Sequence, residues 1–196
     1  MKWYFAVGLL IVTGCVGSSR RVVSPEIDPD AAASAAIDQY DTDGDSTLSK
    51  TECKGSGFDL AKWDTNSDGK LDENEIGQRL RLYAGHGTAL TDLVCVVTLN
   101  GRPLENGKVV FDPEPFLGDT IEAAEGTIDV DGNVMLAIPE LVAEDPVLTG
   151  VRPGLYKVRI THPDVQIPAK YNEQTTLGFD ASPIELLGSP VFQLRK

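Results

Sequence analysis

The 196-residue sequence has few of the residue types on which many enzymes depend: two histidines, two methionines and three cysteines. Histidine is the most frequent general acid or base in catalysis. Neither His86 nor His162 has a cysteine or histidine near it at metal-ligand spacing, and the sequence contains no Gly-x-Ser-x-Gly, phosphate-loop or zinc motif. We therefore expect a protein that is not an enzyme.

Basic residues and long apolar runs are also scarce. The chain has 17 basic and 30 acidic residues, a net charge of -13. A phosphate backbone attracts a basic surface, so we expect no nucleic-acid partner. No run approaches the roughly 20 apolar residues of an ordinary transmembrane helix. The acidic excess instead favours cation binding, or serves solubility.

The N-terminal stretch MKWYFAVGLLIVTGC has the form of an export signal. Lys2 precedes an apolar run, residues 3–12, which has the length of a signal-peptide core. The run closes with Val-Thr-Gly-Cys, which resembles a bacterial lipobox. That resemblance implies a signal peptide over residues 1–14 and a diacylglyceryl group on Cys15, which anchors the chain in a membrane. An ordinary cleaved signal and a buried N-terminal strand remain alternatives.

Changes in composition divide the rest of the chain. Residues 15–29 are polar and without periodicity, which indicates a tether. Residues 30–84 carry helical patterns, with Ile76, Leu80 and Tyr83 on one helical face. Glycines mark residues 85–92 as a linker. From residue 93 to residue 196 the pattern changes to short β-branched runs separated by turn residues such as Asn-Gly and Asp-Gly, which predicts an antiparallel β-sandwich.

The second of two acidic runs, WDTNSDGKLDENE, matches the EF-hand pattern D-x-[DN]-x-[DN]-G-x5-E. Calcium takes six to eight oxygen ligands, and side chains at alternate loop positions can surround one ion while a glutamate closes the shell. Gly69 stands at the sharp turn, and Lys70 contributes its carbonyl. The predicted ligands of this loop are Asp64, Asn66, Asp68, Lys70, Asp72 and Glu75.

The first run, YDTDGDSTLSKTE, matches the same pattern except at the turn, where Ser46 replaces glycine. A left-handed backbone costs a non-glycine residue about 1–2 kcal/mol. We therefore expect two calcium sites, of which the second is the stronger. Leu48 and Leu71 are expected where the paired loops touch. The predicted ligands of the first loop are Asp41, Asp43, Asp45, Thr47, Ser49 and Glu52.

The spacing of the loops points to a compact pair. Asp41 and Asp64 lie 23 residues apart, so only 11 residues separate the loops. This resembles the compact tandem EF-hands of secreted bacterial proteins. It is also similar to dockerin modules, which bind a partner protein, although dockerin loops commonly end in Asp and both loops here end in Glu. Sensor EF-hands expose methionine-rich grooves, which a chain with two methionines does not favour.

The β region resembles carboxypeptidase regulatory-like, transthyretin-like domains. The matching stretches are VCVVTLNGRPLENGKVVFDP, GTIDVDGNVMLAIP and GVRPGLYKVRIT, between Leu93 and Thr161. The resemblance implies an Ig-like sandwich without catalysis, used for display or for recognition of a protein or polysaccharide. Tyr156 is expected to pack inward with its hydroxyl at the sandwich edge. Residues 139–149 are an insertion, expected to be a surface loop.

Together these patterns predict an α+β protein of two domains, a small EF-hand module followed by the sandwich. Its expected role is that of a calcium-binding lipoprotein of the cell envelope, facing the periplasm or the exterior, with a dockerin-like module as the alternative. Cys53 and Cys95 could form a disulfide in such a compartment, or Cys95 could be a small core residue.

Overall fold

A computed structural model of the chain describes residues 22–185 and 188–196. The predicted signal peptide, the predicted lipidation at Cys15 and the first part of the predicted tether lie outside the described residues. Within the described ranges, no helix combines the length and the apolar character needed to cross a membrane.

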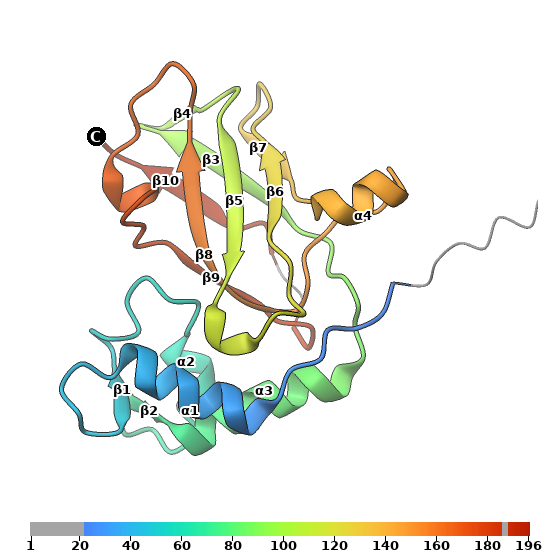
Figure 1. Cartoon of the computed structure of the whole chain (residues 1–196). Helices are drawn as coiled ribbons and strands as arrows, with labels where there is room; N and C mark the ends of the chain where they lie inside the picture. Colours follow the sequence, from blue (N-terminus) through green and yellow to red (C-terminus); the bar gives the residue numbers. More distant parts are fainter. Residues whose placement is uncertain (1–21, 186–187) are drawn as a thin grey trace, which may run out of the picture.

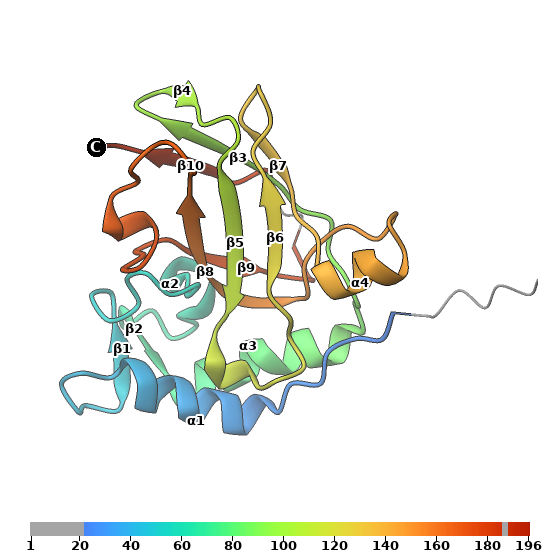
Figure 2. The same cartoon turned by 45° about the horizontal axis from the view of Figure 1, so that its top comes forward.

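The first part of the described chain is helical. Figures 1 and 2 show its two longer helices side by side beneath one end of the β-sheets. Its elements are α1 (Pro29–Tyr40), β1 (Thr47–Ser49), α2 (Leu60–Trp63), β2 (Lys70–Asp72) and α3 (Glu73–His86). The predicted apolar face of α3 is confirmed, since Ile76, Leu80 and Tyr83 are all buried.

Local side-chain bonds explain where the helices begin and end. Asp28 caps α1 by accepting the backbone N–H groups of Asp30 and Ala31 at 3.2 and 3.1 Å, and Pro29 occupies the first turn. The helix α3 begins with a capping box and ends at Gly87, whose φ of 74° suits glycine. It therefore runs two residues into the segment predicted as a linker.

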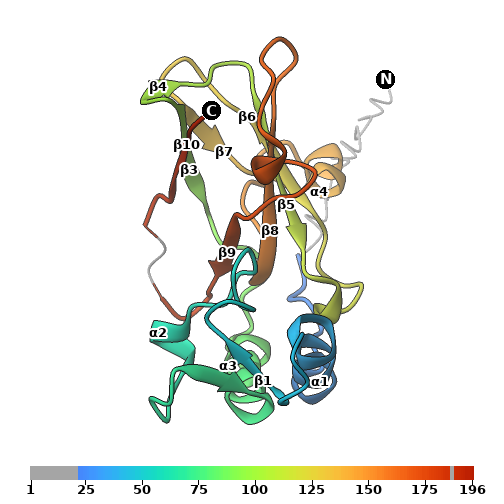
Figure 3. The same ribbon diagram turned by 90° about the vertical axis from the view of Figure 1, so that its left-hand side faces the viewer.

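The rest of the described chain contains two four-stranded sheets, which Figure 3 shows edge-on above the helices. In one sheet β3 (Val94–Leu99) pairs along one edge with β10 (Val191–Leu194) and along the other with β7 (Asn133–Met135) and β4 (Arg102–Pro103). The other sheet has the order β6-β5-β8-β9. Its strands are β5 (Lys108–Pro113), β6 (Ala124–Thr127), β8 (Gly154–Thr161) and β9 (Gly178–Ala181).

The strand pairing differs from the expected antiparallel pattern at one place. The last strand, β10, pairs with β3 in parallel, with Phe192 opposite Val97. A parallel neighbour needs a long crossover rather than a hairpin. The connection from β3 to β10 runs through residues 100–190 and includes strands of both sheets. The remaining pairs of the two sheets are antiparallel.

Two further segments depart from the sequence-based expectation. The Asp-Gly hairpin forms, but its arms belong to different sheets: β6 pairs with β5, and β7 pairs with β3. The insertion expected as a surface loop instead contains a short helix, α4 (Pro139–Glu144), because Pro139 suits a first helical turn.

The core between the sheets is apolar and continuous. Phe111 of β5 approaches Phe192 of β10 with ring centroids 6.2 Å apart. The predicted inward packing of Tyr156 is confirmed, because the residue is fully buried. Its hydroxyl donates to the carbonyl of Arg152 at 2.7 Å, a bond of the kind made by corner tyrosines. Burial raises the pKa of this phenol.

The helical part and the β part of the chain are in direct contact. A 3-10 turn, η1 (Pro115–Leu117), follows β5, and its Phe116 stacks on Phe58 at 5.7 Å. A Cβ on Gly178 of β9 would lie only 1.5 Å from the carbonyl oxygen of Ser56, so these two backbones meet without room for a side chain. A second 3-10 turn, η2 (Ala169–Tyr171), lies between β8 and β9.

The described part of the predicted tether, residues 22–29, is bound to the β part of the chain, and its last residue, Pro29, begins α1. The guanidinium of Arg152 donates to the carbonyl of Val23 at 2.6 Å, and Glu26 and Thr120 exchange two hydrogen bonds of 3.0 and 2.7 Å. Ile27 is buried. This segment is therefore part of the folded structure.

Candidate metal centre

The two acidic runs fold as two loops joined back to back, which we call loop 1 (residues 41–52) and loop 2 (residues 64–75). Strands β1 and β2 pair antiparallel and place Leu48 opposite Leu71. Both leucines have 0% exposed surface. The predicted contact between the loops is thereby confirmed.

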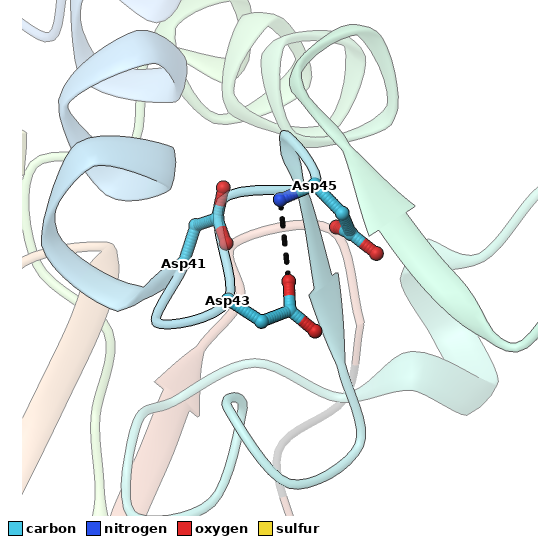
Figure 4. Close-up of side chains that lie close together, drawn as sticks. All are labelled: Asp41, Asp43 and Asp45. Carbon is cyan, nitrogen blue, oxygen red and sulfur yellow. Dashed lines mark hydrogen bonds between the residues drawn. The ribbon is translucent and has the colours of Figure 1, made fainter.

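Loop 1 gathers its first three predicted ligands. Figure 4 shows Asp41, Asp43 and Asp45 on the loop between α1 and β1. One carboxylate oxygen of each lies within 4.8 Å of the others. Asp41 accepts the backbone N–H groups of Gly44 and Ser46 at 2.7 and 2.8 Å. Asp43 accepts that of Asp45 at 3.2 Å. These bonds turn the chain around the carboxylates.

This spacing fits a hard divalent cation. Oxygen ligands of calcium lie at about 2.3–2.6 Å from the ion, so two ligands of one ion are separated by at most about 5 Å. The three carboxylate oxygens meet that limit. The predicted donors in both loops are carboxylate, amide, hydroxyl and carbonyl oxygens, which are the ligands that calcium prefers.

Glu52, the predicted closing ligand of loop 1, already spans the loop. Its carboxylate accepts the backbone N–H of Thr42 at 2.7 Å and that of Ser49 at 2.8 Å, together with the Thr42 hydroxyl at 2.9 Å. The bonds from Ser49 and Thr42 lower the pKa of Glu52 to about 2. The closing group is therefore an anion at neutral pH.

Loop 2 repeats the hydrogen-bond pattern of loop 1, although among the described residues only Asp41, Asp43 and Asp45 gather three acidic groups within 4.8 Å. Asp64 accepts the backbone N–H groups of Ser67 and Gly69 at 2.6 and 2.8 Å. The side-chain oxygen of Asn66 accepts the N–H of Asp68 at 2.8 Å. The first, third and fifth positions of loop 2 are thus held by the same kind of bonds as those of loop 1.

Glu75, the predicted closing ligand of loop 2, has a more rigid support. Its side chain accepts the N–H of Thr65 at 2.8 Å and that of Asp72 at 3.2 Å, while Asp72 accepts the N–H of Glu75 at 2.8 Å. Glu75 is only 3% exposed and lies in the first turn of the 14-residue helix α3. Turns follow Glu52 instead of a helix.

The backbone of the two loops bears the same strain. In loop 1, Gly44 and Ser46 are left-handed, with φ of 78° and 64°. In loop 2, Ser67 and Gly69 are left-handed, with φ of 63° and 84°. Each loop thus holds one serine and one glycine in this region, in exchanged positions. The strain at Ser46, the reason given for a weaker first site, does not distinguish the loops.

One side chain connects the loops. The ammonium group of Lys70, a residue of β2, contacts the carboxylate of Asp45 in loop 1. This hydrogen bond lowers the pKa of Asp45 and raises that of Lys70. A positive charge from loop 2 thus already balances one carboxylate of loop 1.

The two cysteines of the described chain are separate thiols, so the disulfide considered between Cys53 and Cys95 is not formed. Cys95 lies fully buried in β3, and Cys53 lies 3.9 Å from the carbonyl of Leu48. Burial raises the pKa of both thiols to about 12. Both behave as small core residues.

The sequence-based prediction missed the residue before each loop. Tyr40 donates its hydroxyl to Glu114 at 2.6 Å, and the indole N–H of Trp63 donates to Asp180 at 3.2 Å. A signal was present, because both acidic runs begin with an aromatic residue followed by Asp-Thr. Their carboxylate partners are distant in the sequence and left no such signal.

No protein-family model matches the chain, and no match was found among curated proteins or solved structures.

Proposed function

We propose that the chain is a calcium-binding protein whose helical part is a compact EF-hand pair and whose two sheets form an Ig-like, transthyretin-like sandwich. The observation that carries this proposal is the pair of back-to-back loops, each with oxygen ligands at alternate positions and a closing glutamate. The buried tyrosine bond to Arg152 supports the sandwich assignment.

Each ion is held by the predicted ligands of one loop. Repulsion among clustered carboxylates opposes folding, and a bound dication removes it. Calcium binds the folded loops and stabilises them by RT ln(1 + [Ca]/Kd), about 2.7 kcal/mol when calcium is at 100 times Kd. Its role in this proposal is structural.

Loop 2 remains the stronger site in this proposal, for a reason that differs from the sequence-based one. Its closing carboxylate, Glu75, is buried and fixed by the capping box of α3. Less side-chain freedom is lost when such a group binds an ion. Loop 1 also has Lys70 at Asp45, and an ion must compete with that ammonium group.

We further propose that the protein is exported and lipid-anchored through Cys15, faces the periplasm or the exterior of the cell envelope, and has a non-catalytic structural or recognition role toward a protein or a polysaccharide. The lipobox-like N-terminus supports the anchoring. Mass spectrometry of the mature N-terminus tests it, since an unmodified Cys15 within an uncleaved chain contradicts it.

Calorimetric titration with calcium tests the central proposal. We expect two binding events and a higher melting temperature in calcium than in chelator. Glu75→Gln abolishes the stronger event, and Glu52→Gln removes the weaker one with a smaller loss of stability. Glu73→Gln is the matched control, because Glu73 is an exposed acid in the same helix turn. Absence of binding at millimolar calcium refutes the proposal.

A dockerin-like module that binds a partner in a calcium-dependent way is the alternative. In the structure Phe58 stacks on Phe116, and Trp63 and Tyr83 both bond to Asp180, so these side chains contact the chain's own β part. A pull-down with and without chelator separates the two functions. Calcium-dependent retention of one defined partner favours the alternative.

A further inference from the structure

Each loop begins directly after an aromatic residue that bonds a buried carboxylate of the β part. Tyr40 ends α1 and precedes Asp41, and its hydroxyl donates to Glu114, which has 0% exposed surface. Gln39 adds a bond to the same carboxylate at 3.0 Å.

We call the hydrogen bond between this aromatic residue and its buried carboxylate a link. Loop 2 has an equivalent link, which is built from other elements. Trp63 ends α2 and precedes Asp64, and its indole N–H donates to Asp180 of β9. The Asp180 side chain is only 7% exposed and also accepts the hydroxyl of Tyr83 from α3. Asp180 thus receives one bond from the helix before loop 2 and one from the helix after it.

A cation completes each link in the same way. The Lys157 ammonium lies 3.9 Å from the Glu114 carboxylate and 5.4 Å from the centre of the Tyr40 ring. The Arg79 guanidinium lies 3.9 Å from Asp180 and 5.8 Å from the centre of a Trp63 ring. Each buried carboxylate therefore has an aromatic donor and a cation, and that cation also faces the aromatic ring.

We infer that Glu114 and Asp180 are positioning residues of the two metal loops, Glu114 for loop 1 and Asp180 for loop 2. The inference rests on the proposed function. A buried carboxylate that loses its donor is strongly destabilised, so each aromatic residue is held in place. The first ligand of the loop is the next residue in the chain, and its backbone is fixed with the aromatic residue.

Calcium binding and the formation of each link should affect each other reciprocally. If a link holds the first ligand in the geometry that the ion needs, removing the link weakens calcium binding at that loop, and calcium in turn strengthens the link. The two links use different carboxylates on different elements, Glu114 after β5 and Asp180 in β9. Each is therefore expected to act on its own loop. A purely structural role predicts no such selectivity.

The experiment measures calcium binding in full chains that keep one working loop. Glu75→Gln leaves loop 1, and Glu52→Gln leaves loop 2. Into each we introduce Glu114→Gln or Asp180→Asn and titrate with calcium by calorimetry. Glu114→Gln is expected to weaken binding about five-fold or more when only loop 1 works, and Asp180→Asn to do so when only loop 2 works; this is the lower end of ordinary coupling between sites. Each of these two variants is expected to leave calcium binding at the other loop unchanged.

Milder variants test whether misfolding, instead of the lost bond, causes the weaker binding. Tyr40→Phe removes the hydroxyl donor and keeps the ring, and Trp63→Phe keeps an aromatic residue without an N–H. Both are expected to reproduce the loop-selective weakening while circular dichroism stays that of the parent chain. Glu122→Gln is the control for losing a paired carboxylate of the β part, because Glu122 bonds Arg152 instead of an aromatic residue at a loop.

The outcomes separate this inference from the function on which it rests. If the unmutated chain takes up no calcium, the proposed function fails. If it binds calcium and the link variants leave both loops unchanged, or weaken both equally, the positioning role is overturned while the calcium sites stand. Weakening confined to the linked loop supports the inference.

Discussion

The left-handed backbone of loop 2 can be tested with two glycines that differ in conformation alone. Gly69 has a φ of 84°, and a Cβ there meets nothing within 4 Å. Gly85, in the last turn of α3, likewise has open space for a Cβ, but its backbone is helical. Because neither alanine encounters a clash, Gly69→Ala and Gly85→Ala isolate the energy of the backbone conformation.

The two substitutions should have opposite signs. At Gly69 the left-handed conformation costs an alanine about 1–2 kcal/mol. Alanine also reduces the conformational entropy of the unfolded chain, which stabilises the fold by about 0.4–1 kcal/mol. The net destabilisation is then about 1 kcal/mol. At Gly85 the backbone is helical, so alanine is expected to stabilise the folded chain by about 0.5–1 kcal/mol relative to glycine. For a chain of this size, each kcal/mol shifts the melting temperature by about 2–4 °C.

Thermal unfolding followed by circular dichroism, in excess chelator so that metal binding does not contribute, measures both effects. We expect Gly69→Ala to melt about 2–4 °C lower than the parent chain and Gly85→Ala to melt higher. Gly44→Ala should behave as Gly69→Ala, since Gly44 has a φ of 78° and the same open surroundings. A shift of one sign at all three positions refutes the assigned loop conformation.

Two further predictions concern ionisable groups in the rest of the molecule. The hydrogen bond from Arg152 lowers the pKa of Glu122 below its unfolded value. The pair therefore stabilises the fold above the unfolded value of about 4.3, and this contribution is lost as the pH falls through the lower, folded pKa. Melting temperatures of the parent chain and Glu122→Gln should differ at neutral pH and converge once the pH lies below that folded pKa. Cys53 and Cys95 are buried free thiols with pKa values near 12, so alkylation should label both only after denaturation. Failure to label them in denaturant without a reductant would indicate the disulfide that the structure lacks.

The loops were predictable because their pattern is local. Alternate acidic residues, a turn and a closing glutamate all lie within one short stretch, and Leu48 and Leu71 are apolar at equivalent positions of the two stretches. Their pairing across β1 and β2 followed from that equivalence. The strain at Ser67 was missed because the pattern specifies glycine only at the sixth position, and the fourth position is equally left-handed.

The long-range features were not predictable in the same way. Short alternating runs predicted strands, but nothing local indicates that β10 pairs in parallel with β3. Asp180 is an isolated acid in the sequence, and its partners Trp63 and Tyr83 lie 117 and 97 residues away. Burial of such a carboxylate depends on how the helices dock on the sheets, which only the folded chain determines.

The backbone contact between Ser56 and Gly178 bears on how the chain can be divided. Main chain meets main chain there, and any side chain at position 178 would force the two parts away from each other. The loops and the sheets are therefore poorly suited to be exchanged between proteins as independent cassettes. A cut after α3, near Gly87, would place Trp63 and Asp180 on separate fragments and break the hydrogen bond between them.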